Sequence, residues 1–305
     1  MQGFDSDLGM SRAHEFTIHG GPRVTPRFSV VVPAYNADQT LTATLDSLLA
    51  QEFTDWECVV VDDGSQDQTA RIVEVYRDRD SRFRLVQQEN GGTAAANNAG
   101  VTAASSDLLV ICAADDFLLP AHLMIMDDLI RRNSDCGIFS SNGTYLDDET
   151  GASRPARVGV EWSQERSLTL PDVLRACFYS VGAVFRREAF ALAGGFRDGV
   201  YVDDYDLWLR AMARGVRHRY TPEILSVHRV SSVQKSASVL TVREWDARVI
   251  EDLIASGVLG GKDLAVAQTS ARRHRRNLRI RRAATSILGS NAEHVIAALR
   301  GTRLR

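Results

Sequence analysis

Residues 28–36 read FSVVVPAYN, and residues 58–65 read CVVVDDGS. Each stretch is a short run of β-branched residues that ends at a proline or at polar residues, which is the pattern of a buried strand. Between them a helix is predicted, with Asp38 as its N-cap and with leucines at i, i+4, i+7 and i+8 from Leu41 on one buried face. A strand, a helix and a second strand in this order predict parallel strands joined by crossover helices.

The same alternation continues along the chain, and after Pro120 it becomes mixed. The further elements expected are a helix around 72–76, strands at 84–86 and 108–112, a helix that ends near Arg132, short strands within 137–146 and 183–185, and a helix over 204–214. We therefore predict an α/β fold with an open, mostly parallel sheet flanked by helices, followed by a C-terminal helical extension.

Three polar clusters come immediately after predicted strands: residues 35–36, 62–63 and 115–116. In open α/β sheets, ligands bind beyond the carboxyl ends of the strands. We therefore expect the three clusters to line one crevice.

Asp115 and Asp116 are adjacent carboxylates at a predicted strand end, where they are costly unless they are solvated, paired or bound to a metal. Carboxylate oxygens suit Mg²⁺ or Mn²⁺, and magnesium completes its shell with water and substrate phosphates, so this pair predicts a phosphorylated ligand. The alternative is a turn or an N-cap pair before a helix at Leu118.

The composition is that of a globular protein, with 44% hydrophobic and 25% charged residues. The 305 residues allow one large domain, or a domain of about 200 to 230 residues with an appendage. Residues 1–26 lack the pattern of a secretory signal and are interpreted as a flexible lead, so we expect a cytoplasmic protein.

The cysteines show no C-x-x-C spacing and are interpreted as reduced core residues: Cys58, Cys112, Cys136 and Cys177.

Charge is distributed unevenly along the chain. From Ser231 onward there are 14 Lys or Arg against 6 Asp or Glu, a net charge of +8, whereas residues 1–230 carry −11. The run of arginines at 272–282 could attract anionic lipid headgroups at the inner face of the plasma membrane, an acidic partner or nucleic acid, or it could be a solvated helix face. Nucleic acid is not expected, because no aromatic residues are interleaved with the arginines.

Two classes of nucleotide-binding protein are disfavoured. The triplet at 91–93, GGT, is not a G-x-G-x-x-G fingerprint and is not followed by an acidic residue at the dinucleotide spacing, which argues against a dehydrogenase. Residues 33–40 lack a Gly-rich, basic signature, which argues against a nucleotidyltransferase. The glycines at 91 and 92 are interpreted as a turn.

Seven motifs occur in order: VVPAYN at 31–36, LDSLLAQ at 45–51, VVDDGSQD at 60–67, NGG at 90–92 with NAG at 98–100, ADD at 114–116, GGF at 194–196 and DDYDLW at 203–208. Together they resemble the family 2 inverting glycosyltransferases, which have the GT-A fold. The resemblance covers roughly residues 28–230. It implies a domain over 27–232, with a nucleotide-sugar-binding half at 27–118 and an acceptor and catalytic half at 119–232, before a basic helical extension at 233–305.

The resemblance also implies how the donor is held. Pro33, Ala34 and Tyr35 match the loop that holds the nucleotide base, with Tyr35 as the stacking ring. Asp63 matches the acidic residue that contacts the base or ribose, and Asp115 would reach the ribose side.

A metal bridging the diphosphate, Mg²⁺ or Mn²⁺, is implied at Asp116. His228 and Arg229 lie where the family often has a basic or His-containing motif near the diphosphate, so His228 is a further candidate for the metal, although a lone histidine is more often a surface or core residue. Many members carry Asp where this chain has Ala113 and Arg where it has Asn97, a position on the donor side.

Asp204 matches the catalytic base, and Asp203 stands where the family usually has Glu, on the acceptor side. Gly194 and Gly195 match the turn before that segment and would also line the acceptor side. Without the resemblance, the preference of acidic residues for a helix N-terminus is the favoured explanation of the carboxylates at 203, 204 and 206.

The expected activity is transfer of a sugar, with inversion, from a nucleoside-diphosphate sugar to a hydroxyl of a glycan, lipid-linked or small-molecule acceptor. UDP is the default nucleotide, with GDP and dTDP open. The alternative is a catalytically silent relative that binds nucleotide-sugar.

Overall fold

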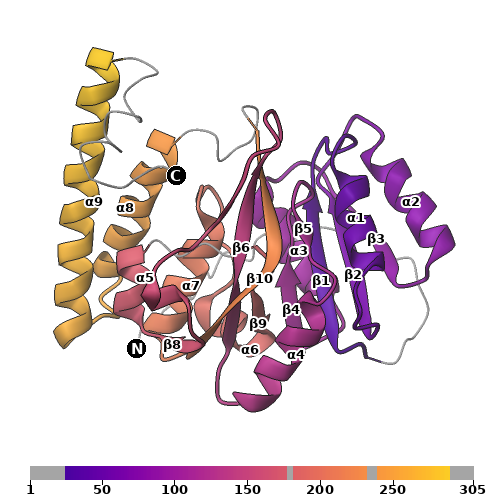
Figure 1. The fold of residues 1–305 in the computed structure, drawn as a ribbon, viewed down its shortest axis with the longest axis horizontal. Coiled ribbons are helices and arrows are strands. Elements are labelled where there is room, and N and C mark those ends of the chain that lie inside the picture. Colours follow the sequence, from indigo (N-terminus) through magenta and orange to yellow (C-terminus); the bar gives the residue numbers. More distant parts are fainter. Residues whose placement is uncertain (1–24, 177–180, 232–238, 289–305) are drawn as a thin grey trace, which may run out of the picture.

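The structure is a computed structural model that describes residues 25–176, 181–231 and 239–288. A ten-stranded sheet forms the centre of this part of the chain (Figure 1). The strands are β1 (Phe28–Ala34), β2 (Trp56–Asp62), β3 (Phe83–Gln87), β4 (Leu108–Ile111), β5 (Phe117–Leu118), β6 (Ile138–Asp147), β7 (Ser153–Pro155), β8 (Arg166–Leu168), β9 (Val184–Arg186) and β10 (His218–Val230). Most of the predicted lead at 1–26, Cys177, and residues 233–238 and 289–305 of the predicted extension lie outside the described residues.

The strand order is β3-β2-β1-β4-β9-β6-β10-β5, with β7 paired to β6 and β8 to β10. The first four strands are mutually parallel, and β6 and β10 are parallel to each other. Strand β9 runs antiparallel between β4 and β6, and β5 runs antiparallel to β10. The parallel half follows from the strand and helix alternation in the sequence. The mixed half begins at β5, slightly before the Pro120 that was predicted, because Phe117 and Leu118 already pair antiparallel with β10.

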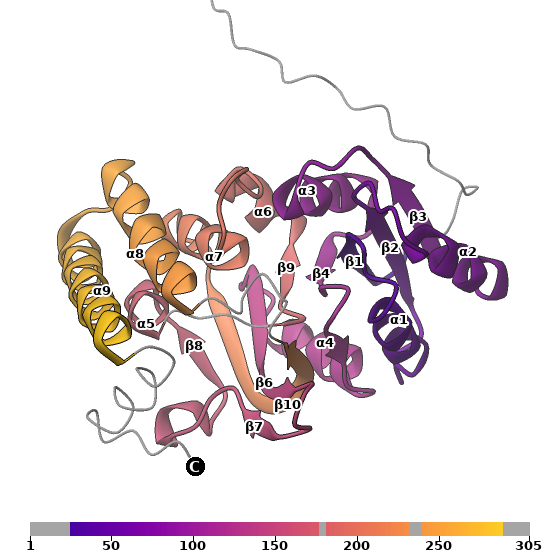
Figure 2. The same cartoon turned by 90° about the horizontal axis from the view of Figure 1, so that it is seen from above.

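Helices cover both faces of the sheet, with α1 and α4 on one side and α3, α6 and α7 on the other (Figure 2). They are α1 (Leu41–Leu49), α2 (Thr69–Arg79), α3 (Thr93–Ala103), α4 (His122–Arg132), α5 (Leu170–Ala176), α6 (Arg187–Ala193), α7 (Asp203–Ala213), α8 (Val239–Ala255) and α9 (Gly261–Leu288), with a 3₁₀ turn at Val160–Trp162. Two large buried apolar clusters fill the two layers, one under α1, α2 and α4 and one under α5, α7, α8 and α9. The predicted open α/β sheet flanked by helices, with a C-terminal helical extension, is confirmed.

Two local predictions are wrong. Helix α1 begins at Leu41 with Thr40 at its N-cap position. Asp38 lies two residues before the N-cap, where its backbone N–H donates to Asp67. The segment at Leu118 is strand β5 and not a helix, because it pairs with β10, so Asp115 and Asp116 do not cap a helix there. The other form of that alternative, a turn, is present, and the N–H of Asp116 donates to the carbonyl of Ala113 at 3.0 Å.

The C-terminal helices share the core of the rest of the protein. Helix α8 packs on α7, and α9 packs on α5. Val249, Ile250 and Leu253 of α8 belong to the same buried cluster as Trp208 of α7 and Phe185 of β9. Residues 239–288 are therefore an integral layer of the fold. None of the described helices is both long and apolar enough to cross a membrane.

Cys58, Cys112 and Cys136 are buried and free. The structure therefore confirms three of the cysteines as reduced core residues.

Candidate active site

The loops after β1 and β2 are tied together at the carboxyl edge of the sheet. The backbone N–H of Asn36 donates to Ser65 Oγ at 2.9 Å, and the N–H of Gln66 donates to Asn36 Oδ1 at 2.9 Å. Asn36 takes a left-handed conformation with φ of 48°, which Asn tolerates better than most residues. These contacts fix the backbone beside Tyr35, whose side chain remains 51% exposed. An aromatic ring held open to solvent at a strand end can stack on a planar ligand.

Asp63 organises the turn that precedes α3. Its Oδ1 accepts hydrogen bonds from Gln88 Nε2 at 2.7 Å and from the N–H of Gly91 at 2.9 Å, and its Oδ2 accepts one from the N–H of Gly92 at 2.8 Å. The two glycines form the predicted turn, and Gly92 has a φ of 84°. Asp63 therefore has a structural task in addition to the predicted contact with base or ribose.

Asp116 is buried, with 3% of its surface exposed, and contacts the end of β10. His228 Nδ1 lies 3.0 Å from Asp116 Oδ1 and 3.1 Å from Oδ2, and the backbone N–H of Arg229 donates to Oδ1 at 3.0 Å. The ring of His228 packs edge-on against Tyr145, with 5.3 Å between ring centroids. The structure thus brings together two candidate metal-site residues that are far apart in the sequence.

Four site residues lie within electrostatic range of one another. Burial opposes protonation of His228, but the hydrogen bond and charge of Asp116, followed by the charges of Asp115 and Asp204, raise the pKa of His228. Burial raises the pKa of Asp116, and Asp115 raises it further, against the effect of His228. The charges of the loop after β4 and of the first turn of α7 therefore act on His228 at the end of β10, and Asp115, Asp116, Asp204 and His228 are called the acidic centre.

Helix α1 holds the acidic loop, residues 114–116, by side-chain hydrogen bonds to its backbone. Thr44 Oγ1 donates to the backbone carbonyls of Ala114 at 3.0 Å and Asp116 at 2.8 Å. Gln51 Nε2 donates to the carbonyl of Leu119 at 2.9 Å, and Gln51 Oε1 accepts from the N–H of Leu123 at 3.1 Å. These buried contacts fix the position of the loop.

The first turn of α7 carries the candidate base. Asp203 Oδ1 accepts from the N–H of Asp204 at 3.1 Å, and Asp204 Oδ1 accepts from the N–H of Tyr205 at 2.7 Å. Asn97 Nδ2 lies 3.4 Å from Asp203 Oδ2, and its own Oδ1 is buried without a hydrogen-bond partner. Asp203, Asp204 and Asp206 lie in the first turn of the helix, where acidic side chains favour the helix dipole, so this placement fits both interpretations of the motif.

Asp206, by contrast, is structural. It is buried between two arginines, with Arg197 Nε at 3.0 Å from Oδ2 and Arg210 Nε at 2.8 Å from Oδ2. Arg210 also donates to the carbonyl of Gly195 at 2.7 Å and to the carbonyl of Ala193. The ion pairs thereby attach the Gly194–Gly195 turn to α7.

A second contact holds the same turn. Asn98 Nδ2 donates to the carbonyl of Phe196 at 2.9 Å, and the N–H of Phe196 donates to Asn98 Oδ1 at 3.0 Å. Gly194 and Gly195 have φ values of 82° and 74°, which only glycine adopts readily. The turn is thus fixed both to α3 and to α7, next to the start of the helix that carries Asp204.

Sequence reasoning missed the residues that position the site. Thr44, Ser47 and Gln51 lie on one face of α1 and its end, and this polar stripe beside the leucines was the available signal. The roles of Arg197 and Arg210 had no comparable signal, because their shared partner, Asp206, was grouped with the other acidic residues of the motif.

Within the described residues, no three His, Cys, Asp or Glu side chains form a ready metal cluster. The residues present nevertheless fit a magnesium or manganese site of the sparse type, in which water and substrate phosphates supply most ligands. Asp116 is a buried carboxylate beside a second carboxylate, Asp115, and its pKa is raised. Such a pair is stabilised by a nearby cation.

Comparison with known proteins shows the family of the chain. The model of the family described as glycosyl transferase family 2 matches residues 29–192. The chain belongs to glycosyl transferase family 2. This match includes strands β1 to β4, the loops between them and the acidic loop at 114–116.

Relatives of this family 2 chain come from several bacteria. It is 29% identical over 213 residues to the uncharacterized glycosyltransferase EpsJ of Bacillus subtilis, covering 67% of this chain and 61% of EpsJ. It is 30% identical over 233 residues to the uncharacterized protein MT1568 of Mycobacterium tuberculosis, covering 72% of each. It is 26% identical over 186 residues to chondroitin synthase of Escherichia coli, covering 61% of this chain and 26% of that enzyme.

Solved structures share the fold of this family 2 member. TarS 1–349 of S. aureus in complex with UDP-GlcNAc has a TM-score of 0.69 and 20% identity, covering 88% of this chain and 77% of the other. The mannosyltransferase PcManGT from Pyrobaculum calidifontis in complex with GDP-Man and Mn²⁺ has a TM-score of 0.58 and 21% identity, covering 95% and 84%. These neighbours confirm the GT-A-like fold.

Proposed function

We propose that this family 2 glycosyltransferase is a metal-dependent, inverting enzyme that transfers a sugar from a nucleoside-diphosphate sugar to an acceptor hydroxyl. The observation that carries the proposal is the meeting of Asp115, Asp116 and His228 with Asp204 at the carboxyl edge of the sheet. This arrangement supports a donor phosphate site and a base that act beside each other.

The donor is proposed to be a UDP-sugar. TarS was solved with UDP-GlcNAc and PcManGT with GDP-Man, so the fold accepts both nucleotides, and UDP is favoured by the higher TM-score of the UDP-GlcNAc complex. The base would stack on Tyr35 in the loop formed with Pro33 and Ala34, and Asp63 and Asp115 would contact the nucleoside. Asn97 would contribute a buried amide oxygen on the same side.

The metal would be held by Asp116, with His228 as the second protein ligand in reach. PcManGT was solved with Mn²⁺, and we propose Mn²⁺ or Mg²⁺ here. When bound, a divalent cation supplies stabilisation of the negative charge on the departing diphosphate. The carboxylates of Asp115 and Asp116 alone would repel that diphosphate, so binding of donor and metal should be coupled.

Asp204 would act as the general base. Its carboxylate would accept the proton of the acceptor hydroxyl while the hydroxyl oxygen forms a bond to the anomeric carbon and the bond from that carbon to the diphosphate breaks. A single displacement inverts the anomeric configuration. The hydrogen bond from the N–H of Tyr205 keeps Asp204 oriented at the helix terminus, and Asp203 with the Gly194–Gly195 turn would border the acceptor.

The acceptor is proposed to be a growing polysaccharide or another glycoconjugate. Relatives include the chondroitin synthase and the O-antigen biosynthesis glycosyltransferase WbnJ of Escherichia coli, the latter 23% identical over 226 residues. This chain covers 26% of the length of that chondroitin synthase, so the proposal concerns the transfer reaction and not a complete polymerase.

Titration calorimetry with UDP tests the proposal. We expect UDP affinity to fall at least tenfold when Mn²⁺ is replaced by chelator, and to fall similarly in Asp116→Asn with Mn²⁺ present. Asn is chosen because its Oδ1 can still accept the N–H of Arg229, which protects the fold. Asp107→Asn is the control, since Asp107 is exposed at the opposite, amino end of β4. Equal UDP affinity with Mn²⁺ and with chelator would contradict the metal assignment.

A further inference from the structure

Helix α9 is the outermost helix of the described part of the chain, and it packs on α8 and α5 (Figure 1 and Figure 2). It contains the basic run at 272–282, which includes seven arginines. The structure shows that these arginines fall into three groups with different surroundings.

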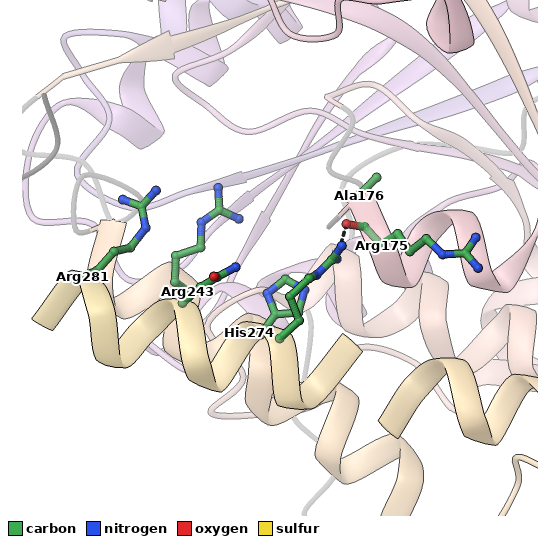
Figure 3. A pocket seen from close by; sticks show the side chains of 7 residues that line it. Arg175, Ala176, Arg243, His274 and Arg281 are labelled. Carbon is green, nitrogen blue, oxygen red and sulfur yellow. Dashed lines mark hydrogen bonds between the residues drawn. The ribbon is translucent and has the colours of Figure 1, made fainter. Parts of the chain in front are cut away.

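The first group borders a pocket between α9, α5 and α8, and it consists of Arg273 and Arg281 (Figure 3). Arg273 donates to the backbone carbonyl of Arg175 at 2.6 Å, and Arg281 likewise interacts within the protein. These two arginines are therefore engaged inside the fold.

The second group is paired with carboxylates of α8. Arg275 forms an ion pair with Glu251 at 2.5 Å, and Arg282 forms one with Glu244 at 2.6 Å. Each carboxylate offsets the charge of its own arginine, so this group adds little net charge to the surface.

The third group faces solvent. Arg272, Arg276 and Arg279 are exposed, and within the described residues their side chains form no ion pair or hydrogen bond. They stand at i, i+4 and i+7, which places them on one side of the helix. Glu251 borders the same hollow, but both of its oxygens accept hydrogen bonds from Arg275. The charge of these three arginines is therefore not neutralised by a partner of their own.

Two exposed isoleucines share this side of the helix. Ile280 is 49% and Ile287 is 80% exposed, and they follow Arg276 at i+4 and i+11, which keeps them on its side. After Asp263, α9 contains no acidic residue. We call the following residues the outward face: Arg272, Arg276, Arg279, Ile280 and Ile287.

We propose that the outward face of α9 binds the surface of an anionic lipid bilayer. Arginine side chains are attracted by anionic headgroups, and isoleucine side chains on such a helix enter the boundary between headgroups and acyl chains. The isoleucines favour lipid over a partner recognised by charge alone. Nucleic acid is a poorer fit, because α9 has no Phe, Tyr or Trp to stack on bases. The proposal does not depend on the proposed sugar transfer.

Sedimentation with phosphatidylglycerol vesicles, against neutral phosphatidylcholine vesicles, tests the arginines in the full-length protein. We expect wild type to bind the phosphatidylglycerol vesicles, and to bind them more weakly as salt is raised, because salt screens the attraction. In the triple variant Arg272→Gln, Arg276→Gln and Arg279→Gln, binding should fall at least about tenfold, since each arginine near such a surface strengthens binding by roughly fivefold.

The matched control is a triple variant of α2, which lies at the opposite end of the molecule from α9 (Figure 1). It consists of Arg71→Gln, Arg77→Gln and Arg79→Gln, and it removes the same charge. We expect it to bind the vesicles within about twofold of wild type, because charges far from the surface are screened. Circular dichroism of both variants confirms that the helices are retained before binding is compared.

A second pair of variants tests the apolar part of the outward face. Ile287→Gln should bind the phosphatidylglycerol vesicles several-fold more weakly than wild type, because its side chain no longer enters the acyl boundary. Val160→Gln is the control, since Val160 is 87% exposed and lies outside α9. It should bind as wild type does.

Three results would overturn the proposal. One is a wild-type protein that does not bind phosphatidylglycerol vesicles; if it binds polyglutamate instead, the partner is an acidic protein. Another is equal weakening by the two triple variants, since this would mean that total charge and not the outward face attracts the vesicles. The third is unchanged binding by Ile287→Gln, which would show that the helix does not enter the bilayer surface.

Discussion

At the scale of single residues, the site depends on polar groups that are buried with defined partners. Asp116 illustrates what the sequence can and cannot predict. Its position after a buried strand predicted a phosphate or metal site. Its contact with His228 depends on the pairing of β10 with β5 and β6, which no local pattern encodes. Asp206 belongs to the motif that contains the candidate base, and its burial between Arg197 and Arg210 shows a structural task that the motif does not indicate.

His122 is a buried titratable residue that should make stability depend on pH. It is fully buried, its Nδ1 donates to the carbonyl of Leu225 at 3.0 Å, and burial lowers its pKa to about 4. In the unfolded chain a histidine titrates near 6.5. Above that pH His122 is neutral in the folded and in the unfolded state, and its contribution to the free energy of unfolding is fully present. As pH falls from about 6.5 to about 4, only the unfolded state takes up the proton, so the free energy of unfolding decreases.

The measurement is chemical denaturation of wild type and His122→Asn at pH 7.5 and pH 5.0. Asn is chosen because its Nδ2 can replace the donor to Leu225. We expect the free energy of unfolding of wild type to fall by about 2 kcal/mol more than that of the variant between these pH values, at about 1.4 kcal/mol per pH unit below 6.5. A difference between the two proteins that does not change with pH would show that His122 does not titrate in this way.

At the scale of elements, α1 and α8 have tasks that their sequences only partly predict. The leucines of α1 predicted its buried face, but its polar stripe also holds the acidic loop. Helix α8 was expected to belong to an extension used for association, and it is instead packed into the core beside α7. The net charge of residues 239–288 could not predict this packing. Helices α8 and α9 carry their arginines and their buried apolar residues on different faces.

Leu253 of α8 tests whether this packing stabilises the whole protein. Its side chain is 3% exposed and belongs to the cluster that contains Trp208 and Phe185. We expect Leu253→Ala to lower the free energy of unfolding by about 2 to 5 kcal/mol in a single transition. Leu192→Ala is the matched control, because Leu192 is 47% exposed, and its effect should be roughly 0.5 kcal/mol or less. A separate unfolding transition for α8 and α9, with the rest of the protein unaffected, would contradict an integral layer.

At the scale of the whole molecule, the sequence predicted the parallel half of the sheet closely and the mixed half only in outline. Runs such as 58–61 are apolar on both faces and lie between helices, so their partners follow from the order of elements. Strand β9 sits between β4 and β6 although it comes after both in the chain, and three-residue strands carry little pattern of their own. The gathering of the loops after β1, β2 and β4 at one edge could be predicted because it follows from parallel strands alone, whereas the approach of β10 and α7 required the mixed half.

The most direct test of the central claim, that the acidic centre performs sugar transfer with Asp204 as base, is the turnover of Asp204→Asn. A thermal-shift screen of nucleotide-sugars with Mn²⁺ first identifies the donor. Asn preserves the hydrogen bond to the N–H of Tyr205, and Asp263→Asn, a change to a first-turn aspartate of α9, is the control. We predict that Asp204→Asn binds the donor as wild type does while kcat falls by about 10² to 10⁴. Sugar transfer by Asp204→Asn at the wild-type rate would contradict Asp204 as the base. A wild-type protein that binds the donor but transfers sugar to no acceptor would indicate a catalytically silent relative.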